Sequence, residues 1–135
     1  MASDFVHLHL HTHYSMLDGA CTASGLVKLA QEMNMDSIAI TDHGYVGGAE
    51  EFHRVLTKAG MKPIVGCEAY VSPTTRFDHS ANVPHIKGHH LVLLCENETG
   101  YKSLCKATSL DLVGNRRNGA FAMVRGLVEH ESVHK

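Results

Sequence analysis

Imidazole side chains alternate with apolar ones near the start of the chain. They occupy every second position of one short stretch: His7, His9, His11 and His13. A β-strand repeats its side chains every two residues, so a strand over 5–11 would carry imidazoles on one face and a buried row of Val6, Leu8 and Leu10 on the other. Neutral imidazole is the commonest metal ligand in proteins. The stretch therefore favours a metal site over a half-buried strand with a histidine-rich polar face.

Further metal-ligand side chains flank the later apolar runs. They lie just after the first run, at the end or start of a later one, or, for Glu68, in the carboxyl-terminal half of one: Asp18, Asp42, His43, Glu68, His89 and His90. Functional residues of parallel α/β folds gather at the carboxyl ends of strands, so we expect these side chains to converge with His9 and His11. Histidine with carboxylates, and no cysteine pair, suits Zn, Mn or Fe. Glu68 could bridge two ions, and two ions about 3.5–4 Å apart form the clamp used in phosphate ester hydrolysis.

Several of these residues have a second interpretation at this point. His7 can be a core residue or can support a ligand, and Asp18 before Gly19 can be a turn residue. Asp42 can cap the following helix, although we favour a role in holding a ligand histidine, as outer partners of metal sites do. His89 and His90 are equivalent candidates. The remaining histidines are expected at the surface: His13, His53, His79, His85, His130 and His134.

The order of secondary structure predicts an α/β fold. Apolar periodicity and turn residues give the expected elements: strand 5–11, helix 24–34, strand 37–41, helix 48–59, strand 61–71, loop 72–88, strand 91–95 and helix 101–113. Thr22 or Ser24 is expected to cap the first helix and Thr99 the third, and Gly60 to end the second. Alternation of strands and helices predicts a parallel sheet with right-handed crossovers.

The composition fits one globular domain of 135 residues with an apolar fraction of 44%. A net charge of −2 argues against a general polyanion-binding surface. The cysteines are widely spaced and predict free thiols in a reducing compartment: Cys21, Cys67, Cys95 and Cys105. The N-terminus lacks the apolar run of a signal peptide, and no segment approaches 18 apolar residues, so we expect a cytoplasmic protein without a membrane span.

The motifs together resemble a known family, the PHP (polymerase and histidinol phosphatase) domain. The resemblance lies in 9–15 (HLHTHYS), 17–20 (LDGA), 39–44 (AITDHG) and 63–71 (PIVGCEAYV). Residues 90–97 (HLVLLCEN) and 100–104 (GYKSL) are similar to the version of this domain at the N-terminus of bacterial DNA polymerase III α subunits. The match covers about residues 4–110.

This resemblance implies a distorted seven-stranded βα barrel, of which the chain supplies parallel βα units. It also implies a centre of two or three divalent ions (Zn, Mn or Fe), with phosphoesterase or 3′–5′ nuclease activity in some members. Carried over residue by residue, the metal ligands would be His9, His11, Asp18, His43, Glu68 and His90. His89 is the alternative to the last, and Asp42 would support the site from behind the ligands.

The later motifs of the family do not occur in recognisable form. We therefore expect 1–113 to be the N-terminal portion of a PHP domain and 114–135 to be a divergent, frayed tail, in a fragment of a longer protein. The expected partners are the remainder of the polymerase chain or other replicase subunits, and DNA through the full-length protein. Alone, the chain is expected to have little activity, or only a scaffold role, and to self-associate through unpaired barrel edges.

Overall fold

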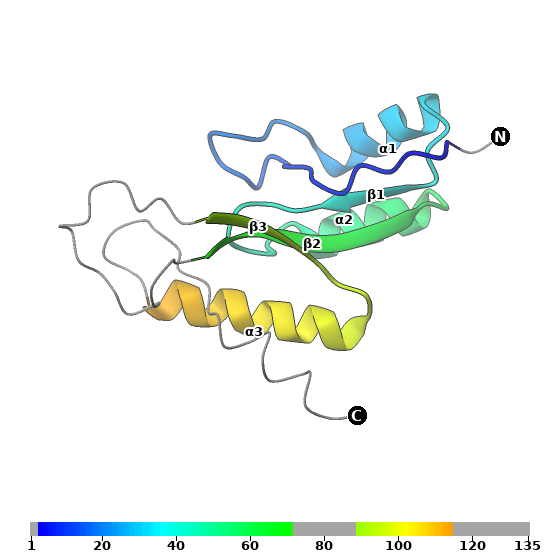
Figure 1. Ribbon diagram of the computed structural model, residues 1–135. Helices are drawn as coiled ribbons and strands as arrows, with labels where there is room; N and C mark the ends of the chain where they lie inside the picture. The colour runs from blue at the N-terminus through cyan, green and yellow to red at the C-terminus, as the bar shows by residue number, and fades with distance from the viewer. Residues whose placement is uncertain (1–2, 72–88, 115–135) are drawn as a thin grey trace.

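A computed structural model describes residues 3–71 and 89–114, with side chains up to residue 109. Its elements run in the order α1 (Ala23–Glu32), β1 (Ser37–Ile40), α2 (Ala49–Lys58), β2 (Lys62–Val71), β3 (His89–Leu94) and α3 (Glu98–Gly114). The strands form one sheet in the order β1-β2-β3, with α1 against α2 and with α2 and α3 against β2 (Figure 1). The predicted α/β class is confirmed.

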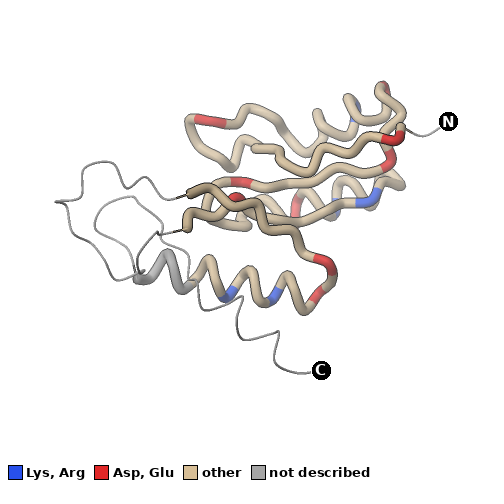
Figure 2. The backbone as a smooth tube through the Cα atoms, viewed as in Figure 1, with Lys and Arg blue, Asp and Glu red and all other residues tan. Residues whose placement is uncertain are grey.

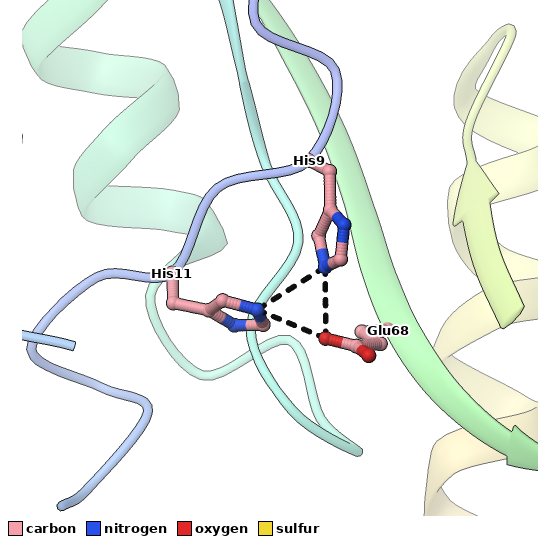
Figure 3. Close-up of side chains that lie close together, drawn as sticks. All are labelled: His9, His11 and Glu68. Carbon is pink, nitrogen blue, oxygen red and sulfur yellow. Dashed lines mark hydrogen bonds and ion pairs between the residues drawn. The ribbon is translucent and has the colours of Figure 1, made fainter. Parts of the chain in front are cut away.

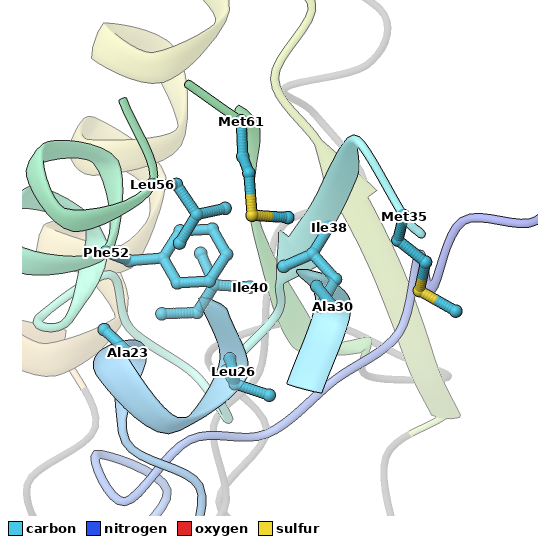
Figure 4. Close-up of a cluster of buried hydrophobic side chains, with 9 residues drawn as sticks. All are labelled: Ala23, Leu26, Ala30, Met35, Ile38, Ile40, Phe52, Leu56 and Met61. Carbon is cyan, nitrogen blue, oxygen red and sulfur yellow. The ribbon is translucent and has the colours of Figure 1, made fainter. Parts of the chain in front are cut away.

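The parallel βα unit is built around one apolar core. β1 pairs with β2 in parallel, with Ser37 opposite Lys62 and Ile40 opposite Val65. The core side chains come from α1, β1, α2 and the turns beside them (Figure 4): Ala23, Leu26, Ala30, Met35, Ile38, Ile40, Phe52, Leu56 and Met61. Burial of these side chains fixes the end of β1, and the residues that follow it, against the helices.

The helix boundaries follow local chemistry. The Thr22 hydroxyl accepts the Gly25 N–H at the start of α1, as one of the two predicted caps. Gly60 follows α2 with φ of +73°, a conformation that glycine adopts without strain. The predicted Thr99 cap is wrong, because α3 starts one residue before it. The Asn97 side chain instead accepts the Gly100 N–H at 3.0 Å.

The last strand differs from its prediction in direction. β3 runs antiparallel to β2, with His90 opposite Tyr70 and Val92 opposite Glu68. An antiparallel neighbour needs no helical crossover between the two strands. The consequence is that β3 begins, and does not end, beside the carboxyl-terminal half of β2. The predicted loop over 72–88 lies outside the described residues.

The predicted strand over 5–11 does not form a regular ladder. The Ala39 N–H donates to the His7 carbonyl and the Thr41 N–H to the Leu10 carbonyl, both at 2.9 Å. A spacing of two residues, from Ala39 to Thr41, thus faces a spacing of three, from His7 to Leu10, as in a β-bulge, which can re-aim side chains. The period of two is broken: Leu10 packs on the core, whereas Leu8 is 48% exposed.

Candidate metal centre

The carboxylate of Glu68 is the centre of the cluster that the sequence predicted. Its side chain is only 3% exposed, and its Oε2 lies 2.9 Å from Nε2 of both His9 and His11. These two imidazoles come from the N-terminal segment and point at β2 from the same side (Figure 3). The three ligand atoms lie within 4.8 Å of one another, which is close enough for one ion to join them.

A second group shares one member with the first. His11, Asp18 and His43 also place one ligand atom each within 4.8 Å of the others. The His43 Nε2 contacts the Asp18 carboxylate, and the His11 and His43 rings stack with centroids 4.1 Å apart. His43 Nδ1 is also 3.4 Å from Glu68 Oε2. The two groups are therefore contiguous and not separate sites.

The pairing of β2 with β3 distinguishes His90 from His89. Residues opposite one another in an antiparallel pair share a face, and side chains alternate along each strand. His90 is opposite Tyr70, two residues from Glu68, and so lies on the face of Glu68. Its Nδ1 contacts Glu68 Oε1. His89, opposite Val71, lies on the other face.

Backbone hydrogen bonds fix the relative position of His43 and Glu68. The Glu68 N–H donates to the Asp42 carbonyl at 3.0 Å, and the Gly44 N–H donates to the Glu68 carbonyl at 2.9 Å. These bonds continue the β1–β2 pairing past the end of β1. The sheet thereby aligns one histidine with the central carboxylate before any side-chain contact is made.

The residues fit a divalent cation on the evidence of their charge. In the described part of the chain, each Lys and Arg lies on a helix or at the start of β2, away from the cluster (Figure 2). Glu68 and Asp18 thus have imidazoles, and no Lys or Arg, as partners. A set of donors that consists only of nitrogen and oxygen atoms suits Zn, Mn or Fe.

The pKa shifts of three cluster residues favour ligand atoms that carry no proton. Burial raises the pKa of Glu68, but the neighbouring His9, His43 and His90 outweigh burial and leave it below its ordinary value. The hydrogen bond with His43 lowers the pKa of Asp18. Burial and the nearby His43 lower the pKa of His11. All three shifts favour the deprotonated forms that a metal ion requires.

Asp42 neither caps α2 nor touches an imidazole. It is 2% exposed, and its Oδ1 accepts the Thr12 N–H at 2.6 Å and the Ser15 hydroxyl at 2.7 Å. Its Oδ2 accepts the Thr12 hydroxyl at 2.8 Å. Asp42 therefore anchors the turn that connects His11 to Asp18. It can act on a histidine only through that turn.

The other histidines of the N-terminal stretch lie outside the cluster. The His7 ring packs edge-on against Phe5 with centroids 4.8 Å apart. His7 precedes the extra residue of the bulge, so it is out of phase with His9. His13 is exposed, as predicted, and donates to the Cys21 carbonyl from Nδ1 at 3.2 Å. His79, His85, His130 and His134 lie outside the described residues.

Two site residues escaped the sequence reasoning. Tyr70 follows Glu68 on the same strand face, and its hydroxyl is 3.1 Å from His43 Nδ1. Its ring also meets the His90 ring edge-on at 4.6 Å. The strand period could have indicated Tyr70, since it lies two residues after the central glutamate. Ser15 could not have been placed in this way, because it lies in an irregular turn.

A separate cavity of about 810 Å³ lies between α2 and the start of α3. Its lining includes Pro63 and Val65 of β2, which alternate with the face of Glu68. No member of the metal cluster lines it. The cavity is thus on the helix-covered side of the sheet.

In the described residues, no helix is both long and apolar enough to cross a membrane.

Comparison with known proteins finds a family whose model matches most of the chain. Residues 7–132 match the family model of the PHP domain. The matched range runs past residue 113, and the predicted boundary at that residue stays a prediction. A solved amidohydrolase from Chromobacterium violaceum, with bound sulfate and no metal, has a similar fold at 23% identity and a TM-score of 0.57. That likeness covers 81% of this chain and 34% of the amidohydrolase.

The similar curated proteins are much longer than this chain. The DNA polymerase III subunit alpha of Borreliella burgdorferi is 46% identical over 108 residues, and that of Aquifex aeolicus is 41% identical over 115 residues. The matches cover 80% and 82% of this chain, but only 9% and 10% of the two subunits. The same subunit of Mycobacterium tuberculosis is 42% identical over 119 residues.

Proposed function

The chain belongs to the PHP domain family, and on this premise we propose that it is the N-terminal PHP segment of a DNA polymerase III α subunit, carrying part of a polynuclear metal site for phosphate ester hydrolysis. The observation that carries the proposal is the buried Glu68 carboxylate, around which lie imidazoles from three segments of the chain: His9 and His11, His43, and His90. The identity of 41–46% to polymerase subunits supports the link to DNA replication.

The residues that would hold the ions fall into two groups. His9, His11 and Glu68 form the first, with His90 on the second oxygen of Glu68. Asp18 and His43 form the second, together with His11, which belongs to both groups. His11 can serve only one group at a time, because a neutral imidazole carries a lone pair on only one of its ring nitrogens. When bound, divalent ions in such a site polarise a phosphoryl oxygen and neutralise charge on the leaving oxygen.

The chain's own side chains provide charge and orientation. Glu68 supplies the buried negative charge that gathers His9, His11 and His90. Asp18 holds His43 through Nε2, and the Tyr70 hydroxyl lies at the other ring nitrogen. Asp42 holds the turn between the two groups. The arrangement keeps the ligand atoms close together at the carboxyl-terminal half of β2.

Hydrolysis of a chromogenic phosphodiester with added Mn²⁺ tests the proposal. We expect weak, metal-dependent turnover by the wild type and none by Glu68→Gln, with Glu50→Gln as the control because Glu50 is exposed and pairs with Arg54 on the same helix, away from the cluster. Equal turnover by wild type and Glu68→Gln would refute the assignment to this site.

A metal-stabilised scaffold segment is the second candidate function. The observation in its favour is that the ligand side chains come from separate parts of the fold, so that a bound ion would hold the N-terminal segment, the end of β1, β2 and β3 together. Under this candidate, Mn²⁺ raises the thermal stability of the wild type and not of Glu68→Gln, while neither protein hydrolyses the diester. The two measurements together therefore separate the candidates.

We further propose that the partners are the rest of a polymerase chain or other replicase subunits, that DNA is met through the full-length protein, and that the setting is cytoplasmic. The isolated chain is proposed to self-associate. The exposed apolar side chains Phe5, Leu8, Leu91 and Leu94 support this. Sedimentation velocity would contradict self-association by showing a single monomeric species across a wide concentration range.

A further inference from the structure

The hydroxyl of Ser15 lies at a junction of three groups behind the metal cluster. It is 2% exposed and donates to Asp42 Oδ1 at 2.7 Å. The same oxygen accepts the backbone N–H of His43 at 3.2 Å. His11 Nδ1 lies 3.3 Å from it. One oxygen thus connects a buried carboxylate with two of the candidate ligands.

The groups around the Ser15 hydroxyl determine the direction in which its hydrogen points. A serine hydroxyl has a single hydrogen, and an ionised carboxylate only accepts. Asp42 accepts from Thr12 and from Ser15, so the Ser15 hydrogen points at Asp42. The lone pairs of the Ser15 oxygen are then left for the His43 N–H and for His11. A contact between that oxygen and His11 Nδ1 requires the hydrogen to be on Nδ1.

The hydrogen on Nδ1 also determines the protonation state of the second ring nitrogen of His11, Nε2. A neutral imidazole with hydrogen on Nδ1 carries a lone pair on Nε2. His11 Nε2 is the atom that lies 2.9 Å from Glu68 Oε2 and 3.2 Å from His9 Nε2. Without Ser15, Glu68 would favour a hydrogen on Nε2, because that hydrogen could be donated to its carboxylate. The serine and the glutamate therefore favour opposite tautomers.

We propose that Ser15, held by Asp42, is a positioning residue that keeps the hydrogen of His11 on Nδ1 and so leaves Nε2 bare toward Glu68. This inference rests on the proposed function, since a bare Nε2 is what a metal ligand needs. Partners of this kind orient metal-binding histidines and fix their tautomer. Ser15 itself contacts no ligand atom of the cluster.

Thr12 offers a matched control for Ser15. Its hydroxyl donates to the same carboxylate at 2.8 Å and accepts a backbone N–H, that of Tyr14, at 3.2 Å. It is also 2% exposed. No hydrogen bond between the Thr12 hydroxyl and an imidazole is present. Thr12→Val therefore removes the same kind of anchor as Ser15→Ala, without removing a contact to His11.

The test is long-range ¹H–¹⁵N correlation NMR of the metal-free, full chain with labelled imidazoles, with the His11 signals assigned by their loss in His11→Asn. We expect hydrogen on Nδ1 in the wild type and in Thr12→Val, and a shift toward hydrogen on Nε2 in Ser15→Ala. Hydrogen on Nε2 in the wild type, or an unchanged tautomer in Ser15→Ala, would overturn the proposal.

A titration with Mn²⁺ then measures the consequence for the site. Ser15→Ala is expected to bind the ion about 10–100-fold more weakly than Thr12→Val, as for other losses of a partner behind a ligand. Equal affinity of the two variants would contradict the positioning role. A wild type that binds no metal would refute the proposed function, whereas the hydrogen assignment is judged on the metal-free spectra alone.

Discussion

Replacing Glu68 by Gln removes the charge at the centre of the cluster while keeping the size of the side chain. Two unit charges about 4 Å apart interact by about 1 kcal/mol in water and about 4 kcal/mol at the effective dielectric constant of a protein site. A divalent ion doubles this, to about 2–8 kcal/mol. We take about 2.7 kcal/mol, or about 100-fold in affinity, since the amide oxygen of Gln can still be a ligand.

Thermal unfolding with and without Mn²⁺ measures this difference. At an ion concentration 100 times the wild-type Kd, binding stabilises the folded wild type by about 2.7 kcal/mol. A variant with 100-fold weaker binding gains only about 0.4 kcal/mol at the same concentration. For a chain of this size, the expected rise in Tm is about 8 °C for the wild type and about 1 °C for Glu68→Gln.

Glu50→Gln again serves as the control, because its side chain is 78% exposed and pairs with Arg54 on one helix. It should show the full wild-type rise in Tm. If Glu68→Gln showed the same rise as the wild type, the ion would be bound elsewhere and the reasoning from the cluster would be refuted. A rise in neither protein would mean that these donors do not hold Mn²⁺.

Three more predictions concern the fold around the site. Burial raises the pKa of Cys67 to about 12, so only about one Cys67 thiol in ten thousand is ionised at pH 8. Iodoacetamide should therefore label the exposed Cys21 in the native protein, and Cys67 only when the protein unfolds. Labelling of Cys67 in the native protein would contradict its burial. Gly48→Ala should cost about 1–3 kcal/mol in urea unfolding, because its Cβ would lie 2.6 Å from the Tyr14 ring. Gly100→Ala, whose Cβ would be 3.7 Å from its nearest neighbour, should instead stabilise by about 0.5–1 kcal/mol, and a similar loss in both variants would refute the steric argument. Folding lowers the pKa of His11, so the unfolded chain binds a proton more readily than the folded chain. The metal-free protein should therefore lose free energy of unfolding as the pH falls below about 6.5. The His11→Asn variant should lose less free energy of unfolding than the wild type between pH 8 and pH 6. Parallel pH profiles for these two proteins would rule out the contribution of His11.

The helices and the first two ladder strands could be predicted because their signals are local. Apolar spacing located α1 and α2 to within one or two residues, and Gly60 marked the end of α2. The direction of β3 could not be predicted in this way. The apolar pattern of a strand does not indicate the direction in which the strand runs. Only the pairing of β3 with β2 makes His90 a neighbour of Glu68.

Convergence of the candidate donors could be expected, because strand ends of one sheet meet at one edge. His43 and Glu68 lie together as that rule predicts, and Asp18 contacts His43. His90 joins them from the start of β3, which the antiparallel pairing with β2 brings to the same place. The rule does not reach side chains that act through irregular turns. Ser15 depends on a turn anchored by Asp42, and the exclusion of His7 depends on an extra residue between it and Leu10.

The bulged N-terminal segment gives the two halves of the site different local stabilities. His43 and Glu68 belong to a continuous backbone ladder, whereas His9 and His11 belong to a segment joined to β1 by a few separate hydrogen bonds. Such a segment can open without global unfolding. An ion bound by His9 and His11 would oppose that opening, so it should slow amide hydrogen exchange over 7–12 far more than in the buried helices. The metal would then act as a clasp on the N-terminal segment, and its affinity would include the free energy of closing it.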